Sequence, residues 1–112
     1  PVLSAPETAV TNLDYVTIAD TDYHTIASWT VATGKKGVLH VVEMASNNYT
    51  KARFKLTIAG VVQFTAMQIM GTLTLEYPDV QLAAAAVVLL EATSSDGTSI
   101  AVNGDITGKE VG

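Results

Sequence analysis

The segment Ala52–Ile58 alternates apolar and polar side chains without a break, and this pattern constrains the fold more than any other feature of the chain. Its apolar members are Ala52, Phe54, Leu56 and Ile58, and its polar members are Arg53, Lys55 and Thr57. A period of two places successive side chains on opposite sides of an extended backbone. The segment is therefore predicted to be a strand with one face in a core and the other in water.

The same alternation recurs between Met67 and Tyr77, and no segment shows the apolar stripe of an amphipathic helix. Turn residues separate the extended segments. The predicted strands are Tyr15–Ala19, Tyr23–Thr33, Gly37–Ala45, Thr50–Ala59, Val61–Ala66, Met67–Tyr77, Leu82–Thr93 and Thr98–Ile106. About eight short strands with a turn about every ten residues indicate an all-β antiparallel sandwich or a small barrel.

The run Leu82–Leu90 is nearly all apolar, and its alanines are compatible with either a helix or a strand. We interpret Ala86–Ala92 as a strand buried on both faces, because Val87 and Val88 are β-branched and a Ser-Ser-Asp-Gly turn follows. The side chains expected to point into the core are Phe54, Leu56, Ile58, Leu73, Leu75, Val87 and Leu89.

Residues 1–13 are predicted to form an extended N-terminal arm, and residues 14–112 the sandwich domain. Pro1 and Pro6 suppress regular strand pairing, and the first dozen residues show little alternation. Apolar residues in such an arm gain order only against another surface. The predicted partner-binding residues are Val2, Leu3, Pro6, Val10 and Leu13.

Composition restricts the partners that this chain can have. The chain has 112 residues, a net charge of −5 and no cysteine, so it is one domain without disulfides or thiolate metal sites. Its six basic residues are scattered, which disfavours nucleic acid as a partner. No apolar run long enough to span a membrane and no signal-peptide pattern is present. Only 15% of residues are charged while 48% are hydrophobic, which favours association with copies or partners over a lone monomer.

Residues with catalytic or metal-binding chemistry are few. Ser28, His24 and either Asp20 or Asp22 contain the residue types of a hydrolytic triad, but Ser28 lies in mid-strand without a glycine-rich elbow. The segment Asp20–Asp22 resembles the start of a calcium loop but lacks the later glycine and bidentate glutamate. We interpret it as a turn stabilised by local hydrogen bonds. No catalytic residue, metal ligand or cofactor is predicted, and the chain is not expected to be an enzyme.

Aromatic side chains can stack on sugar rings, so they are candidates for a glycan-binding platform. The candidates are Trp29 and the tyrosines at positions 15, 23, 49 and 77. Their spacing does not predict a cluster, and Trp29 in mid-strand is expected to be a core residue. The triplet Asn48-Tyr49-Thr50 matches a glycosylation pattern, which we interpret as a chance match in a turn.

From Tyr23 to Val111 the order of strands and turns resembles that of capsid decoration (cement) proteins of tailed bacteriophages. The resemblance covers roughly four fifths of the chain. The segments that carry it are the Gly34–Gly37 turn, Gly37–Val41, Ala52–Gly60, Leu73–Leu75, Ser95–Thr98 and Gly104–Val111. These are turn and strand patterns rather than catalytic motifs.

The resemblance implies a small jelly roll of two packed antiparallel sheets that forms a homotrimer on the virion surface. The implied function is to bind the major capsid protein and stabilise its lattice, after assembly in the host cytoplasm. Related jelly rolls in phage tails and fibres bind glycans or receptors, and no motif here separates the two roles. The expected function is therefore a capsid-stabilising structural protein, with a virion glycan- or receptor-binding module as the alternative.

Overall fold

The structure is a computed structural model of the chain, and it describes residues 7–112 except for the side chain of Asp79. The described residues form eight strands and contain no helix that is long and apolar enough to cross a membrane. The strands are β1 (Glu7–Ile18), β2 (His24–Thr30), β3 (Lys36–Ser46), β4 (Ala52–Ile58), β5 (Val61–Met67), β6 (Thr72–Leu82), β7 (Val87–Ser94) and β8 (Ile100–Val111).

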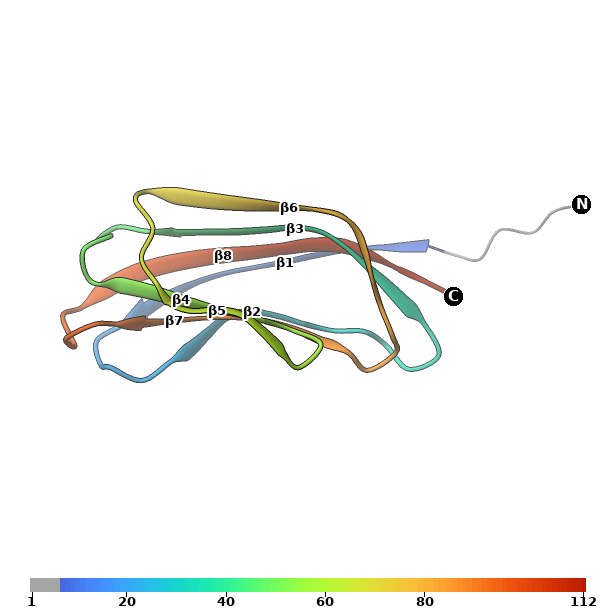
Figure 1. The fold of residues 1–112 in the computed structure, drawn as a ribbon, viewed down its shortest axis with the longest axis horizontal. Coiled ribbons are helices and arrows are strands. Elements are labelled where there is room, and N and C mark those ends of the chain that lie inside the picture. The colour runs from blue at the N-terminus through green and yellow to red at the C-terminus, as the bar shows by residue number, and fades with distance from the viewer. Residues whose placement is uncertain (1–6) are drawn as a thin grey trace, which may run out of the picture.

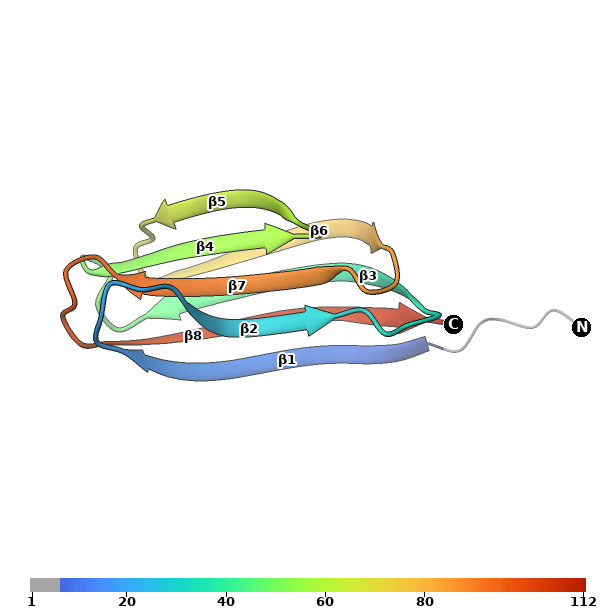
Figure 2. The same cartoon turned by 90° about the horizontal axis from the view of Figure 1, so that it is seen from below.

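The strands form two four-stranded antiparallel sheets that pack face to face (Figure 1). The first sheet has the order β1-β8-β3-β6, and the second has the order β2-β7-β4-β5 (Figure 2). The chain passes between the sheets at every connection except the β4–β5 hairpin. This is the arrangement of a jelly roll, in which two Greek keys form a double sheet. The predicted all-β, jelly-roll-like sandwich is therefore confirmed.

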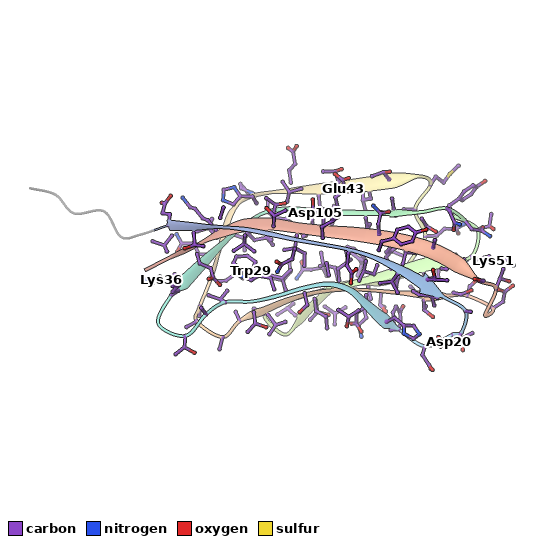
Figure 3. All side chains as sticks on the ribbon, turned by 180° about the vertical axis from the view of Figure 1, so that it is seen from behind. Asp20, Trp29, Lys36, Glu43, Lys51 and Asp105 are labelled. Atoms are coloured by element: carbon purple, nitrogen blue, oxygen red, sulfur yellow. The ribbon has the colours of Figure 1, made fainter. Side chains whose placement is uncertain are left out.

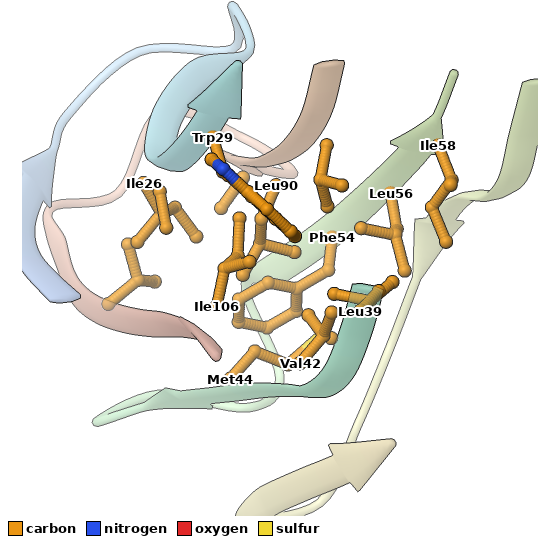
Figure 4. Packing of buried hydrophobic residues seen from close by; sticks show 14 of the residues in the cluster. Ile26, Trp29, Leu39, Val42, Met44, Phe54, Leu56, Ile58, Leu90 and Ile106 are labelled. Atoms are coloured by element: carbon orange, nitrogen blue, oxygen red, sulfur yellow. The ribbon is translucent and has the colours of Figure 1, made fainter. Parts of the chain in front are cut away.

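The core lies between the two sheets and is formed by alternating inward side chains of both (Figure 4). In β4 the inward residues Phe54, Leu56 and Ile58 are buried, as the strict alternation predicts. Leu73 and Leu75 of β6 pack against the same cluster. Apolar burial of this kind supplies the main favourable free energy of folding, about 25 cal/mol per Å² removed from water.

Trp29 is a core residue, as expected, and glycines on the facing sheet make room for it. A Cβ atom at Gly37 of β3 would lie 3.0 Å from the indole ring. A Cβ atom at Gly108 of β8 would clash with the Val38 carbonyl oxygen and would also lie 3.0 Å from the ring. The two sheets can therefore approach each other around the indole only because these positions carry no side chain.

The predicted N-terminal arm is wrong for residues 7–13, which belong to β1. This strand pairs with β8 along its whole length, from Glu7 opposite Val111 to Ile18 opposite Ile100. β1 is an edge strand with one sheet face in water, and Asn12 interrupts its inward apolar pattern. The alternation is consequently weak, and pairing with β8 determines the conformation. The domain therefore begins at or before Glu7 rather than near Asp14.

The boundaries of β6 also differ from the prediction. Met67 ends β5, residues 68–71 form the connection, and β6 continues through Pro78 to Leu82. The predicted strand ended at Tyr77, directly before Pro78. In the structure Pro78 lies between Glu76 and Val80, where the β3–β6 ladder is irregular and residues 77–79 have no partner in β3, so the missing N–H interrupts no paired position.

The predicted register of β7 is wrong by one residue. Val88, Leu90 and Ala92 are fully buried, while Val87 and Leu89 lie on the outer face and are partly exposed. An uninterrupted apolar run contains no alternation from which the inward face can be deduced, and a shift of one residue exchanges the faces. β7 is thus fully buried on one face rather than on both.

The neighbouring leucines of β7 provide a matched test of this register. Leu90→Ala is expected to lower the free energy of unfolding by about 2–5 kcal/mol, because it leaves a cavity in the core. Leu89→Ala should cost about 1 kcal/mol or less, because its side chain is already partly in water. Chemical denaturation measures both values, and equal losses would contradict the register.

The β4–β5 hairpin carries local strain that a substitution should relieve. Ala59 and Gly60 are its two loop residues, and both have positive φ, 51° and 81°. This is the geometry of a type I′ turn, for which Asn-Gly is the favoured pair. Ala59→Asn is expected to raise the free energy of unfolding by about 0.5–1 kcal/mol. Ala83→Asn, at an exposed loop position without positive φ, is the control and should change little. A destabilised Ala59→Asn variant would show that the turn is not strained.

Candidate functional site

The outer face of the first sheet is the surface on which the structure gathers exposed apolar and acidic side chains. In β1 and β8 the even-numbered side chains point inward, since Ile18, Val102 and Ile106 are buried. The odd-numbered side chains of both strands therefore form this outer face. Figure 3 shows Glu43 and Asp105 on this sheet, with Trp29 between the two layers.

The register places residues from all four strands of this sheet in one row. Leu13 of β1 lies opposite Asp105 of β8, and Asp105 lies opposite Glu43 of β3. Glu43 in turn lies opposite Thr74 of β6. Directly opposite residues on one face of an antiparallel pair have Cβ atoms about 4.5–5.5 Å apart. The row is therefore a continuous strip across the sheet.

Two large apolar side chains are exposed at the β1 end of this strip. Leu13 is 68% exposed and Tyr15 is 69% exposed. Tyr15 lies opposite Asn103 of β8, so a phenol ring and an amide are neighbours on the surface. Both side chains lie on β1, which is paired with β8 along its length. A partner that binds them would therefore pay little conformational entropy for ordering the backbone.

Two carboxylates face each other in the middle of the strip. Asp105 and Glu43 lie directly opposite, and like charges in such positions repel. Each accepts a hydroxyl hydrogen bond: Thr107 Oγ1 lies 3.3 Å from Asp105 Oδ1, and Thr74 Oγ1 lies 3.2 Å from Glu43 Oε2. These hydroxyls leave both negative charges in place, so the strip favours a partner that supplies positive charge or hydrogen-bond donors.

The basic residues of this face lie away from the carboxylate pair, at the end of the sheet where β1 begins. Lys109 Nζ lies 3.1 Å from Glu7 Oε1, and Lys36 lies opposite Val111 in the last pair of the β3–β8 ladder. Glu76, by contrast, lies near the middle of the face. It is the next outward residue of β6 after Thr74, which lies opposite Glu43. The ammonium groups of this face thus lie at one end, where Glu7 pairs with Lys109, and carboxylates without a basic neighbour on this face lie in its middle.

Of the predicted partner-binding residues, Val2, Leu3 and Pro6 lie outside the described residues. Val10 packs against the core from β1 and is not presented to a partner. Leu13 is exposed on the outer face of the first sheet. The structure therefore places one of the two described residues of this set on a surface open to binding.

The candidate catalytic residues are only partly brought together. His24 Nε2 lies 2.7 Å from Asp20 Oδ1, and this hydrogen bond is the main reason that the pKa of Asp20 lies below its ordinary value. Ser28 instead lines the seam between β1 and β2, where its carbonyl oxygen accepts a hydrogen bond from the Asn12 amide. His24 and Asp20 therefore form a hydrogen-bonded pair, but without a nucleophile beside them they do not make a triad.

The Asp20–Asp22 segment is a turn, as interpreted from the sequence. Asp20 Oδ1 accepts a hydrogen bond from the Asp22 backbone N–H at 3.0 Å, which is the local bonding that favours Asp in turns. Within residues 7–112, no cluster of three or more His, Cys, Asp or Glu side chains has metal-binding geometry.

The aromatic side chains do not form a cluster. Tyr23 crosses from the start of β2 toward β5, where its hydroxyl accepts a hydrogen bond from Ala66 N at 2.9 Å. Lys55 Nζ lies 5.5 Å from the centre of the same ring. Tyr77 packs against the core, and burial raises its pKa. Tyr15 is thus the ring that stands on an open sheet face.

Trp29 closes the core at the end where β8 finishes. Its Nε1 donates to Glu110 Oε2 at 3.0 Å, and the backbone N–H of Ala32 donates to the same oxygen at 3.0 Å. The hydrogen bond from Trp29 is the largest cause of the lowered pKa of Glu110, followed by that from Ala32. This carboxylate is a structural group rather than a binding group.

Comparison with known proteins gives no family for this chain. No family model matches it, and no curated protein matches it. Among solved structures, it is similar to the crystal structure of the CBM36-1 domain of a multidomain xylanase from the hindgut metagenome of Trinervitermes trinervoides. That similarity covers 96% of this chain and 97% of that chain, with a TM-score of 0.41 and 16% sequence identity. No function or site residue is transferred from that domain to this chain.

Sequence reasoning identified Leu13 but missed the surface to which it belongs. Asp105, Glu43 and Asn103 are far apart in sequence and become neighbours only through the β1-β8-β3 ladder. The available signal was the spacing of Leu13 and Tyr15, which lie two positions apart with Asp14 between them. The interpretation of residues 1–13 as an arm concealed this spacing, because the predicted arm ended at Leu13 and did not include Tyr15.

The Trp29–Glu110 contact predicts a pH dependence of stability. The pKa of Glu110 is lowered from 4.5 in the folded chain, so ionised Glu110 favours folding above that pH, and this stabilisation disappears as the pH falls through the lowered pKa. Glu110→Gln cannot ionise. The difference in unfolding midpoint between the original chain and this variant should be largest at neutral pH and shrink below about pH 4.

The lowered pKa values of Asp20 and Asp96 act equally in the original chain and in Glu110→Gln, so they cancel in that difference. Thermal unfolding followed by circular dichroism gives the midpoints. A difference that stays constant from neutral pH to pH 3 would show that ionised Glu110 does not stabilise the fold.

Proposed function

We propose that this chain is a structural protein of a virus particle. In this proposal it binds the outer surface of a phage capsid and stabilises the lattice of the major capsid protein. The strand order supports the proposal by analogy, because eight-stranded double-sheet jelly rolls occur in viral capsid and lectin domains. Such an analogy supplies a class of function and no residues.

The observation that carries the proposal is the exposure of Leu13 and Tyr15 on a rigid sheet face. Exposed aromatic and aliphatic side chains beside charged ones are typical of binding surfaces, where the apolar groups supply affinity. We propose that these two side chains enter an apolar depression on the capsid protein.

The carboxylates give this surface a preference for its partner. Asp105 and Glu43 would pair with basic groups at the rim of the contact, which favours specificity and rapid association more than affinity. Val2, Leu3 and Pro6 stay predicted as additional contacts. The proposed activity is binding, with no catalytic step and no cofactor.

The proposed assembly is a homotrimer on the virion surface, formed in the host cytoplasm. A weak contact becomes strong when three copies bind one lattice point together, because the second and third contacts form at high effective concentration. A small contact per copy is therefore sufficient for stable decoration.

A second candidate function is glycan or receptor binding by the same face. The observation that favours it is the position of Tyr15 opposite Asn103. A sugar ring can stack on a phenol while an amide and nearby carboxylates bind its hydroxyls. The acidic strip would favour a neutral saccharide over an anionic one.

Binding to capsids that lack the protein tests the first proposal. The original chain should co-sediment with these capsids and raise their rupture temperature. The double variant Leu13→Ser/Tyr15→Ser should bind at least tenfold more weakly, which corresponds to about 1.4 kcal/mol, because it loses both apolar contacts. Binding should also weaken as salt concentration rises.

Tyr49→Ser is the matched control, because Tyr49 is an exposed tyrosine in the turn between β3 and β4 rather than on a strand of this face. Equal binding by the double variant and this control would refute the assignment of the surface. The second candidate replaces the first if the original chain binds a neutral oligosaccharide but does not bind capsids. The Tyr15→Ala variant should then no longer bind the oligosaccharide.

A further inference from the structure

A second surface, on the opposite side of the sandwich, is apolar and uncharged. Its floor is formed by outward side chains of the second sheet, Thr57 of β4 with Val87 and Leu89 of β7. Its walls are the Ala59–Gly60 turn and the loop residues 84–86. No ionisable side chain lines this groove, which distinguishes it from the outer face of the first sheet.

Backbone hydrogen bonds hold the walls of the groove in place. Ala59 N donates to Val87 O at 2.8 Å, which ties the hairpin turn to β7. Ala85 N donates to Val31 O, and Val31 N donates to Ala86 O, both at 2.9 Å. Ala85 has a positive φ of 66°, which costs an alanine free energy and persists because these bonds fix the loop. The groove is therefore preformed.

One exposed valine extends the apolar surface beyond the groove. Val62 lies opposite Thr57 in the β4–β5 ladder, so the two side chains share the outer face of the second sheet. Val62 is 50% exposed. Contiguous exposed apolar surface of this kind marks an interaction site in a soluble domain.

The charge distribution indicates which partner fits this surface. The chain carries a net charge of −5, and the outer face of the first sheet holds carboxylates at its centre. Two copies that met through that face would bring like charges together, which opposes association. The groove offers each copy an uncharged surface that the other can cover without desolvating a charge.

We propose that the groove is the contact between copies of this chain. The inference deepens the self-association that is part of the proposed function, and it does not depend on capsid binding. If each groove covers the same groove of its neighbour, the contact closes as a two-fold dimer. If it covers a different surface, the contact closes as a ring, and three copies form the proposed trimer.

Light scattering of the purified full chain tests this surface with two leucines on opposite faces. The original chain is expected to be an oligomer at micromolar concentration. Leu89→Asp should weaken self-association at least tenfold, because it places a carboxylate in the apolar contact. Leu13→Asp, the same change on the outer face of the first sheet, is the matched control and should leave the oligomer intact.

Ala84→Asp is a second variant, at an exposed loop position in the groove wall, in case Leu89→Asp perturbs β7. Circular dichroism and the unfolding midpoint show whether each variant is folded. A monomeric original chain, or an oligomer that survives both groove variants, overturns the inference. Dissociation by Leu13→Asp as well as by the groove variants would contradict the assignment of the contact to the groove. Capsid co-sedimentation is a separate readout, so failure of the capsid proposal leaves this result interpretable.

Discussion

The packing of Trp29 against two glycines of the facing sheet is the contact on which the rest of this structure depends. An indole ring can lie between the sheets here because Gly37 and Gly108 present backbone where other residues would present a Cβ atom. Glu110 then takes the indole N–H and the Ala32 N–H, so the polar atom of the buried ring has a partner. Without that partner the ring would bury an unsatisfied donor, at a cost of about 1–3 kcal/mol.

This closed core leaves the two outer faces available for binding, and they differ in chemistry. One carries Leu13 and Tyr15 beside a strip of carboxylates, and the other carries an uncharged groove at the β4–β5 hairpin. An acidic domain that contacts copies through this uncharged groove and another molecule through the acidic face of the other sheet can make both contacts at the same time. The proposed function requires that separation, because a lattice-bound oligomer needs one surface for itself and one for the capsid.

The sequence predicts the fold class and part of the register, and the reasons differ from strand to strand. In β4 the strict alternation of Phe54 with charged neighbours defines both faces. In β7 the run of valine and leucine contains no such information, so the inward face could not be deduced. Residues 7–13 of β1 were missed because an edge strand next to water needs little alternation. Its pairing with β8 joins residues up to 104 positions apart, from Glu7 to Val111, which no local pattern reveals. The acidic strip was missed for the same reason, since Asp105 and Glu43 meet only in the ladder.

The central claim is that the outer face of the first sheet binds the capsid, and an electron cryomicroscopy map of the intact particle tests it most directly. The account predicts density for the two-sheet domain on the outer shell, with β1 and β8 facing the capsid protein and Tyr15 buried in the contact. A map in which that face points to solvent, or in which the domain is absent from the shell, would contradict the claim.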